Sequence, residues 1–173
     1  MNDDKTIHYQ PIGIIHTPFT ARAGMPIQSA RVEAAGRVEL DPAYRAALTD
    51  LDGFSHIFLL YHFHKSGPPS MTVQPFLDDV ARGLFATRHP HRPNPLGLSV
   101  VRLERVVLGD PPVLHVLGVD MLDGTPLLDI KPYVPAFDVY HASRTGWLGA
   151  QGAKLAERPW RARFAEDENR GEG

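Results

Sequence analysis

The chain has 173 residues, 43% of them hydrophobic and 22% charged, which is the composition of one globular domain with a proper core. Its formal net charge of −2 argues against a protein that coats nucleic acid electrostatically, and the absence of cysteine excludes disulfides, thiolate catalysis and cysteine-bound zinc. The N-terminus lacks the apolar core of a signal peptide, and no apolar run approaches the roughly 20 residues of a membrane helix. A cytoplasmic protein is therefore expected.

The N-terminal part predicts two short strands separated by a long loop. Residues 9–19, YQPIGIIHTPF, predict a first strand, and residues 36–40, GRVEL, predict a second with Val38 and Leu40 directed inward. The loop over residues 17–35 has no clear periodicity. Loops of that length in a compact domain are usually functional or disordered.

A helical turn and the strongest strand of the chain follow. Asp41 and Pro42 suit the N-cap and first position of a helical turn, which Gly53 ends. Residues 54–64, FSHIFLLYHFH, predict a strand that is apolar on both faces. One face carries Phe54, His56, Phe58, Leu60, His62 and His64, and the other carries Ser55, Ile57, Leu59, Tyr61 and Phe63. Both faces need cover, and a closed barrel covers only one. The other face needs a helix, a loop or a second subunit, and we interpret the pattern as an indication of a dimer.

Four further strands are predicted in the second half, with almost no room for crossover helices. They span residues 82–88, 97–108, 112–120 and 125–134. This spacing predicts a mainly all-β fold, a single compact barrel of mostly antiparallel strands with one short helix. The barrel domain is expected over residues 1–150, and residues 151–173 read as a polar, flexible tail.

The most unusual stretch lies between two of these strands and reads RHPHRPNP, residues 88–95. Three prolines rule out a regular helix or central strand and hold the segment stiff. Arg88 and Arg92 offer planar forks that suit carboxylate or phosphate groups, and the Asn94 side chain can both donate and accept. We interpret the segment as a preorganised site for an anionic partner; the alternative is a rigid connection with solvated arginines.

Two other patterns allow a functional or a structural interpretation. His62 and His64 form an H-x-H pair, which with a third histidine (His56, His89, His91 or His115) could bind a metal, although no further ligand stands beside the pair at metal-site spacing. Near the end of the last strand, Leu127, Asp129, Lys131 and Tyr133 fall on one face if the strand is regular. They form either an acid–base site at a strand end or a surface ion pair.

Several common fingerprints are missing from the sequence. It contains neither the dinucleotide motif G-x-G-x-x-G after a strand nor the phosphate-binding loop G-x-x-x-x-G-K-[ST]. It also lacks the nucleophile elbow G-x-S-x-G of the α/β-hydrolases. Composition and spacing therefore indicate a β-rich domain with a rigid cationic site, and they do not name its chemistry.

Four segments together resemble the TsaA-like family, also called TrmO-like or YaeB-like. They are IGIIHTPF, LDGFSHIFLLYHFH, GLFATRHPHRPNPLGLSVVRLERV and DMLDGTPLLDIKPYVP, and the resemblance covers roughly residues 7–148. Characterised members transfer a methyl group from S-adenosylmethionine to N6 of threonylcarbamoyladenosine at tRNA position 37. The resemblance thus implies a methyltransferase, a β-barrel that acts as a homodimer, and a cofactor bound near the barrel end and the subunit interface, with no metal.

The resemblance also implies site residues. The cofactor is expected to contact Gln28, Ser29, Ala30, Arg31, His64, Lys65, Arg88, Leu98, Asp120, Met121 and Leu122. Arg31 or Arg88 would bind its carboxylate, and Asp120 its ribose hydroxyls. Asp129, Lys131 or Tyr133 would assist loss of the proton from the acceptor nitrogen. Arg92 and Asn94 would face the nucleotide phosphate or the threonyl carboxylate.

One departure from the family leaves the acceptor open. Bacterial tRNA-modifying members carry an additional C-terminal domain that helps to grip tRNA, whereas this chain ends soon after Trp147. A methyltransferase for a smaller acceptor therefore remains an alternative. So do a protein that senses S-adenosylmethionine or an anionic metabolite without turnover, and a histidine–metal barrel enzyme.

Overall fold

The computed structural model describes residues 6–22, 25, 33–75, 78–141 and 144–151. The expected cofactor residues Gln28, Ser29, Ala30 and Arg31 lie outside these ranges, as does nearly all of the expected tail. Among the described residues, no helix is long and apolar enough to span a bilayer.

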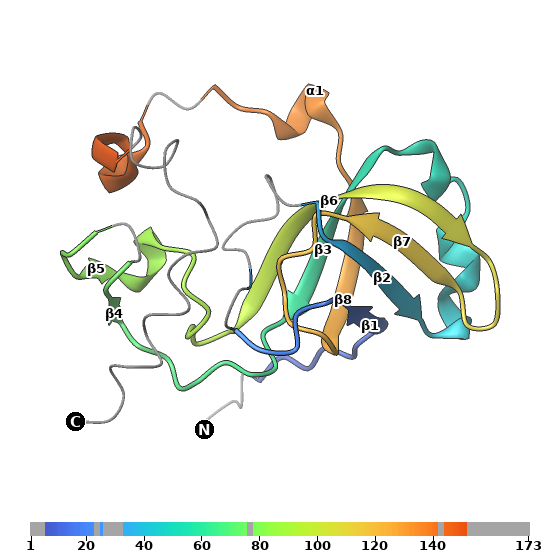
Figure 1. Cartoon of the computed structure of the whole chain (residues 1–173), viewed down its shortest axis with the longest axis horizontal. Helices are drawn as coiled ribbons and strands as arrows, with labels where there is room; N and C mark the ends of the chain where they lie inside the picture. The colour runs from blue at the N-terminus through green and yellow to red at the C-terminus, as the bar shows by residue number, and fades with distance from the viewer. Residues whose placement is uncertain (1–5, 23–24, 26–32, 76–77, 142–143, 152–173) are drawn as a thin grey trace.

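Six antiparallel strands close into a barrel in the order β1-β2-β7-β6-β3-β8 (Figure 1). The strands are β1 (Gly13–His16), β2 (Ala35–Leu40), β3 (His56–His62), β6 (Leu96–Val107), β7 (Val113–Leu117) and β8 (Thr125–Pro132). The prediction of a mainly β, antiparallel barrel is confirmed. Closure leaves none of these six strands as an unpaired edge, because β8 pairs with both β1 and β3.

Alternation of side chains along each strand forms the core. On β3, Ile57, Leu59 and Tyr61 are at most 3% exposed, while the residues between them are half-buried on the outside. β6 alternates in the same way, with Val101 and Leu103 directed inward. The apolar residues that sequence periodicity directed inward therefore meet inside the barrel.

Two predicted strand faces each lose one residue, Leu127 and His64, for a local reason. A register shift between β3 and β8 at Leu60 and Tyr61 inserts a bulge, so Leu127 packs in the core, fully buried, while Asp129 lies on the outside. At the end of β3 the strand stops at His62, whose carbonyl accepts a hydrogen bond from the amide of His64. His64 therefore does not continue the outer face of the strand.

The helical turn after β2 forms as the sequence predicts, although it is a 3₁₀ helix. It spans η2 (Pro42–Leu48), and the carboxylate of Asp41 caps it by accepting from the amide of Ala43 at 2.9 Å. A further turn, η3 (Leu51–Gly53), leads into β3. The one α-helix of the described residues, α1 (Pro135–Asp138), follows β8.

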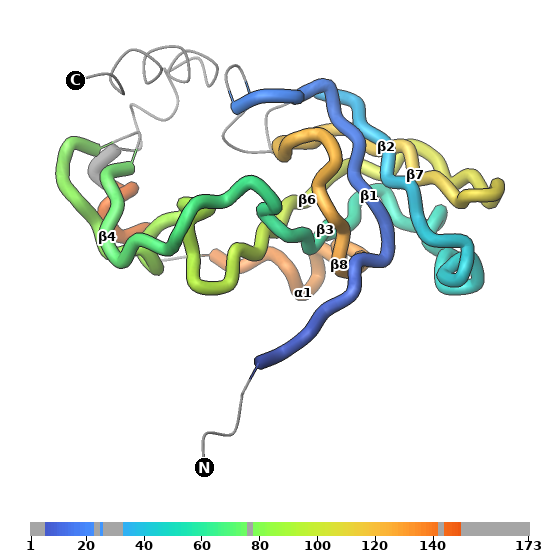
Figure 2. Tube along the Cα trace, turned by 90° about the horizontal axis from the view of Figure 1, so that it is seen from below, coloured from blue at the N-terminus to red at the C-terminus, as the bar shows by residue number. Residues whose placement is uncertain are grey.

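Residues 63–75 and 78–95 form an arm that leaves the barrel between β3 and β6, as Figures 1 and 2 show. The arm carries the two-stranded sheet of β4 (Thr72–Val73) and β5 (Arg82–Gly83), and the turn η4 (Leu84–Ala86). The predicted strand over residues 82–88 is wrong, because only its first two residues pair and the chain then turns. The last described segment, η5 (Gly146–Gln151), contacts the arm where Trp147 Nε1 donates to the carbonyl of Ala86 at 2.8 Å.

Candidate functional site

The cationic corner of residues 88–95 is held by its own polar groups. The amide of His91 donates to His89 Nδ1 at 3.2 Å, and Arg92 Nη1 donates to the carbonyl of Thr87 at 3.0 Å. The Arg92 guanidinium also lies over the ring of Phe85, 5.4 Å from its centroid. Arg92 Nη1 thus helps to hold the corner rigid, while the rest of the guanidinium group can bind a ligand.

The corner is also fixed to the rest of the chain. Ser66 Oγ donates to the carbonyl of Pro90 at 2.9 Å, and the amide of Phe63 donates to the carbonyl of Pro95 at 2.8 Å. Burial lowers the pKa of His89, and the neighbouring charges of His91, Arg22 and Arg92 lower it further. His89 is therefore neutral near pH 7 and can accept the bond that shapes the corner.

Arg88 differs from Arg92. Its side chain is exposed, and no hydrogen bond or ion pair joins it to any part of the chain that the structure describes. The side chain of Asn94 is likewise exposed. A free guanidinium beside a rigid backbone is suited to bind a carboxylate, because the corner around it needs no reordering.

A chain of buried polar groups connects the barrel interior to the turn after β7. The Tyr61 hydroxyl lies 3.0 Å from Ser99 Oγ, and Ser99 Oγ donates to Asp120 Oδ1 at 2.6 Å. Tyr61 and Ser99 are 3% and 4% exposed. Burial, and then the charge of Asp120, raise the pKa of the Tyr61 hydroxyl. Ser99 thus orients one oxygen of a half-buried carboxylate, as a ribose-binding group requires.

The same turn is tied to the end of β1 and to the end of β3. Asp123 Oδ1 accepts from the amide of Thr17 at 3.0 Å, and this bond is the main cause of a lowered pKa for the Asp123 carboxyl. Thr125 Oγ1 donates to the carbonyl of Leu122 at 2.7 Å and lies 3.4 Å from His64 Nδ1. The structure therefore brings the His64 ring and the carbonyl of Leu122 to the same hydroxyl group.

Burial lowers the pKa of His64, and Lys65 and His62 lower it further. The residue after His64 is also held by the N-terminal segment, since Arg22 Nη2 donates to the carbonyl of Lys65 at 2.5 Å. Met121 contributes its backbone rather than its side chain to this end of the barrel. Its side chain is 2% exposed in the core.

Leu98 and the expected acid–base residues lie on the outside of the barrel. Leu98 on β6 and Asp129 on β8 flank Leu60 of β3 in register, and Leu98 is 60% exposed. Asp129 Oδ2 pairs with Lys131 Nζ at 2.8 Å, with the two side chains 42% and 62% exposed.

Tyr133 follows this pair along the chain. Its ring packs edge-on against Phe58, with the ring centroids 5.4 Å apart. Lys131 and Tyr133 therefore lie toward the opposite end of β8 from Thr125, about 20 Å along the strand for six residues. Within one chain these residues are separated from the His64 and Leu122 cluster.

The groups present match S-adenosylmethionine in chemical kind. Arg88 is an exposed cation of the kind that binds a carboxylate, and Asp120 is a carboxylate of the kind that binds hydroxyl groups, with one oxygen held by Ser99. Exposed Leu98 offers an apolar surface. For metal ions the finding differs: in the described ranges, no three histidine, aspartate or glutamate side chains gather as ligands.

Sequence reasoning missed Tyr61, Ser99 and Thr17 as parts of this site. A signal was present for two of them, because Tyr61 and Ser99 are polar residues at inward positions of predicted strands. A hydroxyl that faces a barrel core needs a partner. Thr17 carries no comparable pattern.

Comparison with known proteins identifies the family of this chain. Residues 14–139 match the model of the tRNA-methyltransferase O N-terminal domain. The chain is 50% identical over 150 residues to a Pyrococcus abyssi protein named "Probable S-adenosyl-L-methionine-binding protein", covering 86% of this chain and 80% of that protein. It is 37% identical over 139 residues to the human tRNA (adenine(37)-N6)-methyltransferase, covering 75% of this chain and 30% of the human protein.

Solved structures agree with this result. The crystal structure of TrmO from Pseudomonas aeruginosa superposes with a TM-score of 0.67 at 39% identity, covering 82% of this chain and 62% of that one. The chain thus spans less than two thirds of the matched crystal structure. The matched region contains the corner, the Asp120–Asp123 turn and all of β8. The chain belongs to the tRNA-methyltransferase O N-terminal domain family.

Proposed function

We propose that this protein binds S-adenosylmethionine and transfers its methyl group to N6 of threonylcarbamoyladenosine at tRNA position 37, which would make it a cytoplasmic enzyme. The observation that carries the proposal is the family match over residues 14–139, which includes every described site segment. The name of the human relative supports tRNA as the substrate. The free guanidinium of Arg88 and the oriented carboxylate of Asp120 support the cofactor.

When bound, S-adenosylmethionine supplies an electrophilic methyl carbon on a positively charged sulfur. The residues of this chain would act on the other reactant. The acceptor nitrogen is part of a urea-like group and is a weak nucleophile until it loses its proton. In our proposal the carboxylate of Asp129 accepts that proton. The Lys131 ammonium, which lies 2.8 Å from Asp129 Oδ2, offsets the charge that develops on the acceptor. The Tyr133 hydroxyl would orient the acceptor.

The two halves of this site lie apart in one chain, which supports a homodimer. The outer face of β3 and β6 carries Phe58, Leu60, Leu96, Leu98 and Val100 in register, and Leu96 and Leu98 are 46% and 60% exposed. A second copy that covers this face would bury apolar surface. We propose that the partner's acid–base pair then completes the site at the cofactor end of this chain.

A site that uses residues of both chains of a dimer can be tested by mixing two inactive variants. Arg88→Ala should weaken cofactor binding until turnover is lost, and Asp129→Asn should abolish turnover while cofactor affinity stays intact. If each site uses residues of both chains, mixing the two inactive variants should restore up to about a quarter of wild-type activity through mixed dimers. Failure to restore any activity, with mixed dimers shown by mass spectrometry, would place the whole site in one chain.

Two further variants separate binding from scaffolding. Lys131→Ala should abolish turnover with cofactor affinity intact; loss of cofactor affinity instead would make Lys131 a binding or structural residue. Arg88→Ala should weaken cofactor binding far more than it lowers the melting temperature. The reverse outcome would assign Arg88 to the scaffold.

A second function is favoured by one observation. The Pyrococcus abyssi relative, at 50% identity, is named for S-adenosyl-L-methionine binding alone. A protein that binds the cofactor without methyl transfer, or one that methylates a smaller acceptor, would retain the Asp120 network. It would show no incorporation of methyl groups into tRNA.

A further inference from the structure

Four basic side chains form a row across strands that the proposed site barely uses. In the barrel register, His16 of β1 pairs with Arg37 of β2, Arg37 pairs with His115 of β7, and His115 pairs with Arg105 of β6. Each of four adjacent strands thus contributes one residue at the same level. We call these four residues the basic row.

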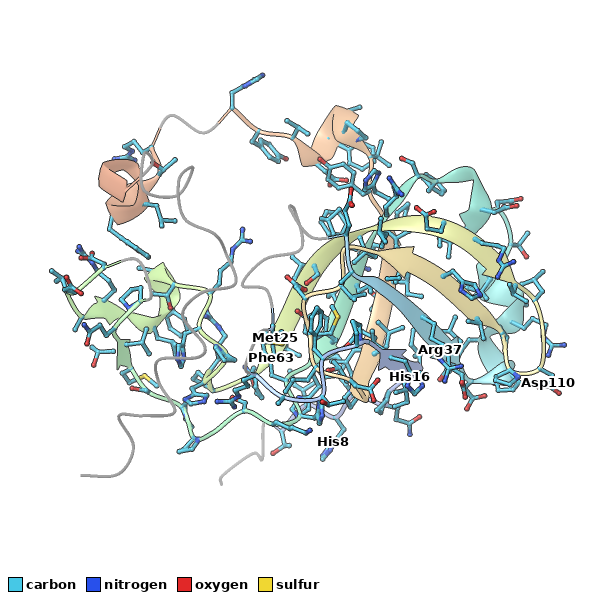
Figure 3. All side chains as sticks on the ribbon, viewed as in Figure 1. His8, His16, Met25, Arg37, Phe63 and Asp110 are labelled. Carbon is cyan, nitrogen blue, oxygen red and sulfur yellow. The ribbon has the colours of Figure 1, made fainter. Side chains whose placement is uncertain are left out.

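The basic row faces away from the core. His16 follows Ile15, Arg37 precedes Val38, and both of those apolar neighbours are fully buried, so the basic side chains point outward. Figure 3 shows His16 and Arg37 beside each other on the outside of the barrel. Since adjacent strands lie about 4.8 Å apart, the row spans about 14 Å.

The charges of its arginines are not neutralised within the described parts of the chain. Arg37 is exposed and makes no ion pair or hydrogen bond there. Arg105 Nη2 donates to His115 Nε2 at 3.1 Å, so its partner is an imidazole nitrogen rather than a carboxylate. Among the residues that the structure describes, His16 is the one member of the row that faces an acid, Asp123, at 3.4 Å.

Two other carboxylates, Glu39 and Glu104, lie on the four strands of the row as the structure describes them. Glu39 lies two residues beyond Arg37 on the same face of β2, and no ion pair joins the two. Glu104 pairs with Arg102, so the negative charge of Glu104 is balanced by that arginine and not by the basic row. Two guanidinium groups therefore remain available, although the whole chain carries a net charge of −2.

We propose that the basic row binds the sugar–phosphate backbone of the RNA that carries the acceptor nucleotide. The proposal rests on the proposed function and names a substrate-gripping surface for it. Guanidinium groups pair with phosphate through two parallel hydrogen bonds. The row begins at His16, whose partner Asp123 lies in the turn that also holds Asp120. An acceptor nucleotide that reaches the cofactor at this turn would leave flanking phosphates along β2, β7 and β6.

The test measures binding of unmodified tRNA by fluorescence anisotropy, without cofactor, from 50 to 200 mM salt. The variants are Arg37→Ala and Arg105→Ala. The matched control is Arg45→Ala, which makes the same change in charge at a residue paired with Asp110 at 3.5 Å in the β6–β7 loop. Each row variant should weaken binding about 3- to 10-fold at low salt and reduce the slope of log affinity against log salt by roughly 0.7–0.9. Arg45→Ala should change neither.

Cofactor titration of the same variants separates this proposal from the proposed function. Unchanged cofactor affinity in the variants with weaker tRNA binding would support the basic row. Wild-type affinity and salt slope in both row variants, equal weakening in Arg45→Ala, or absence of tRNA binding by the wild-type protein would overturn it, even if cofactor binding and methyl transfer to a small acceptor persist. Absence of cofactor binding by the wild-type protein would instead refute the proposed function. Binding to anionic vesicles but not to tRNA would also overturn the row as an RNA surface.

Discussion

Replacing Ser99 with alanine removes the hydroxyl at the centre of the buried chain that joins Tyr61 to Asp120. Ser99 donates to Asp120 at 2.6 Å, so its oxygen accepts from the Tyr61 hydroxyl at 3.0 Å. The substitution would leave the Tyr61 hydroxyl, in a residue that is 3% exposed, without this partner. It would also free the Asp120 carboxylate from the group that orients it.

The magnitude follows from these two losses. A buried hydroxyl without a partner costs about 1–3 kcal/mol, and a lost bond to a carboxylate costs about 1.5–3 kcal/mol. Because Asp120 is only half-buried, water replaces part of the second term. We expect Ser99→Ala to lower the free energy of unfolding by about 3 kcal/mol. Tyr61→Phe, which leaves Ser99 bound to Asp120, should cost about 1 kcal/mol.

Urea denaturation of the two single variants and the double variant would measure the coupling. Once Ser99 is alanine, removing the Tyr61 hydroxyl should cost little or restore stability, because that hydroxyl is already unpaired. Ser99→Ala should also weaken S-adenosylmethionine binding if Asp120 holds the ribose. Strictly additive losses, or a Ser99→Ala variant within about 0.5 kcal/mol of wild type, would refute the reasoning.

Three other predictions follow from the same geometry. A Cβ on Gly97 would overlap the Tyr61 ring, so Gly97→Ala should cost about 1–3 kcal/mol in urea denaturation. Gly53→Ala is the control, since its Cβ would meet nothing within 4 Å, and equal losses would contradict the packing. Because the Tyr61 pKa is raised from 10.0, the hydroxyl's contribution to the free energy of unfolding is complete below pH 10 and is lost as pH rises further. Above pH 10, wild type should lose up to about 1.4 kcal/mol of this free energy per pH unit relative to Tyr61→Phe. Plots of the free energy of unfolding against pH that run parallel for the two proteins would disprove this. The lowered pKa of Asp123 has the opposite sign: its stabilisation is present above pH 3.8 and is lost as pH falls. In acid, the free energy of unfolding of Asp123→Asn should therefore fall less than that of wild type, by well under about 1 kcal/mol at this partly exposed site. Equal acid losses in the two proteins would speak against the Thr17 bond.

Much of the barrel is predictable from the sequence because its strands alternate. Val38 and Leu40 pointed inward by period alone, and both are core residues. Asp41 and Pro42 predicted the capped turn from local chemistry, which needs no tertiary information. The stiffness of residues 88–95 was likewise predictable from three prolines.

The features that failed depend on register between distant strands. The bulge that separates Leu127 from Asp129 arises where β8 pairs with β3, and period-two reasoning has no access to that pairing. Tyr61, Ser99 and Asp120 meet only when the barrel closes, since they come from two strands and a turn. The basic row is similar, because each of its members belongs to a different strand.

The most direct test of the central claim is calorimetric titration of the full, metal-stripped chain with S-adenosylmethionine, followed by transfer of labelled methyl groups to bulk tRNA that lacks the modification. The account predicts micromolar binding and label in the tRNA. Binding without transfer would keep the cofactor but place the acceptor elsewhere or favour a sensor. Absence of binding would contradict the assignment of Arg88 and Asp120 to an S-adenosylmethionine site.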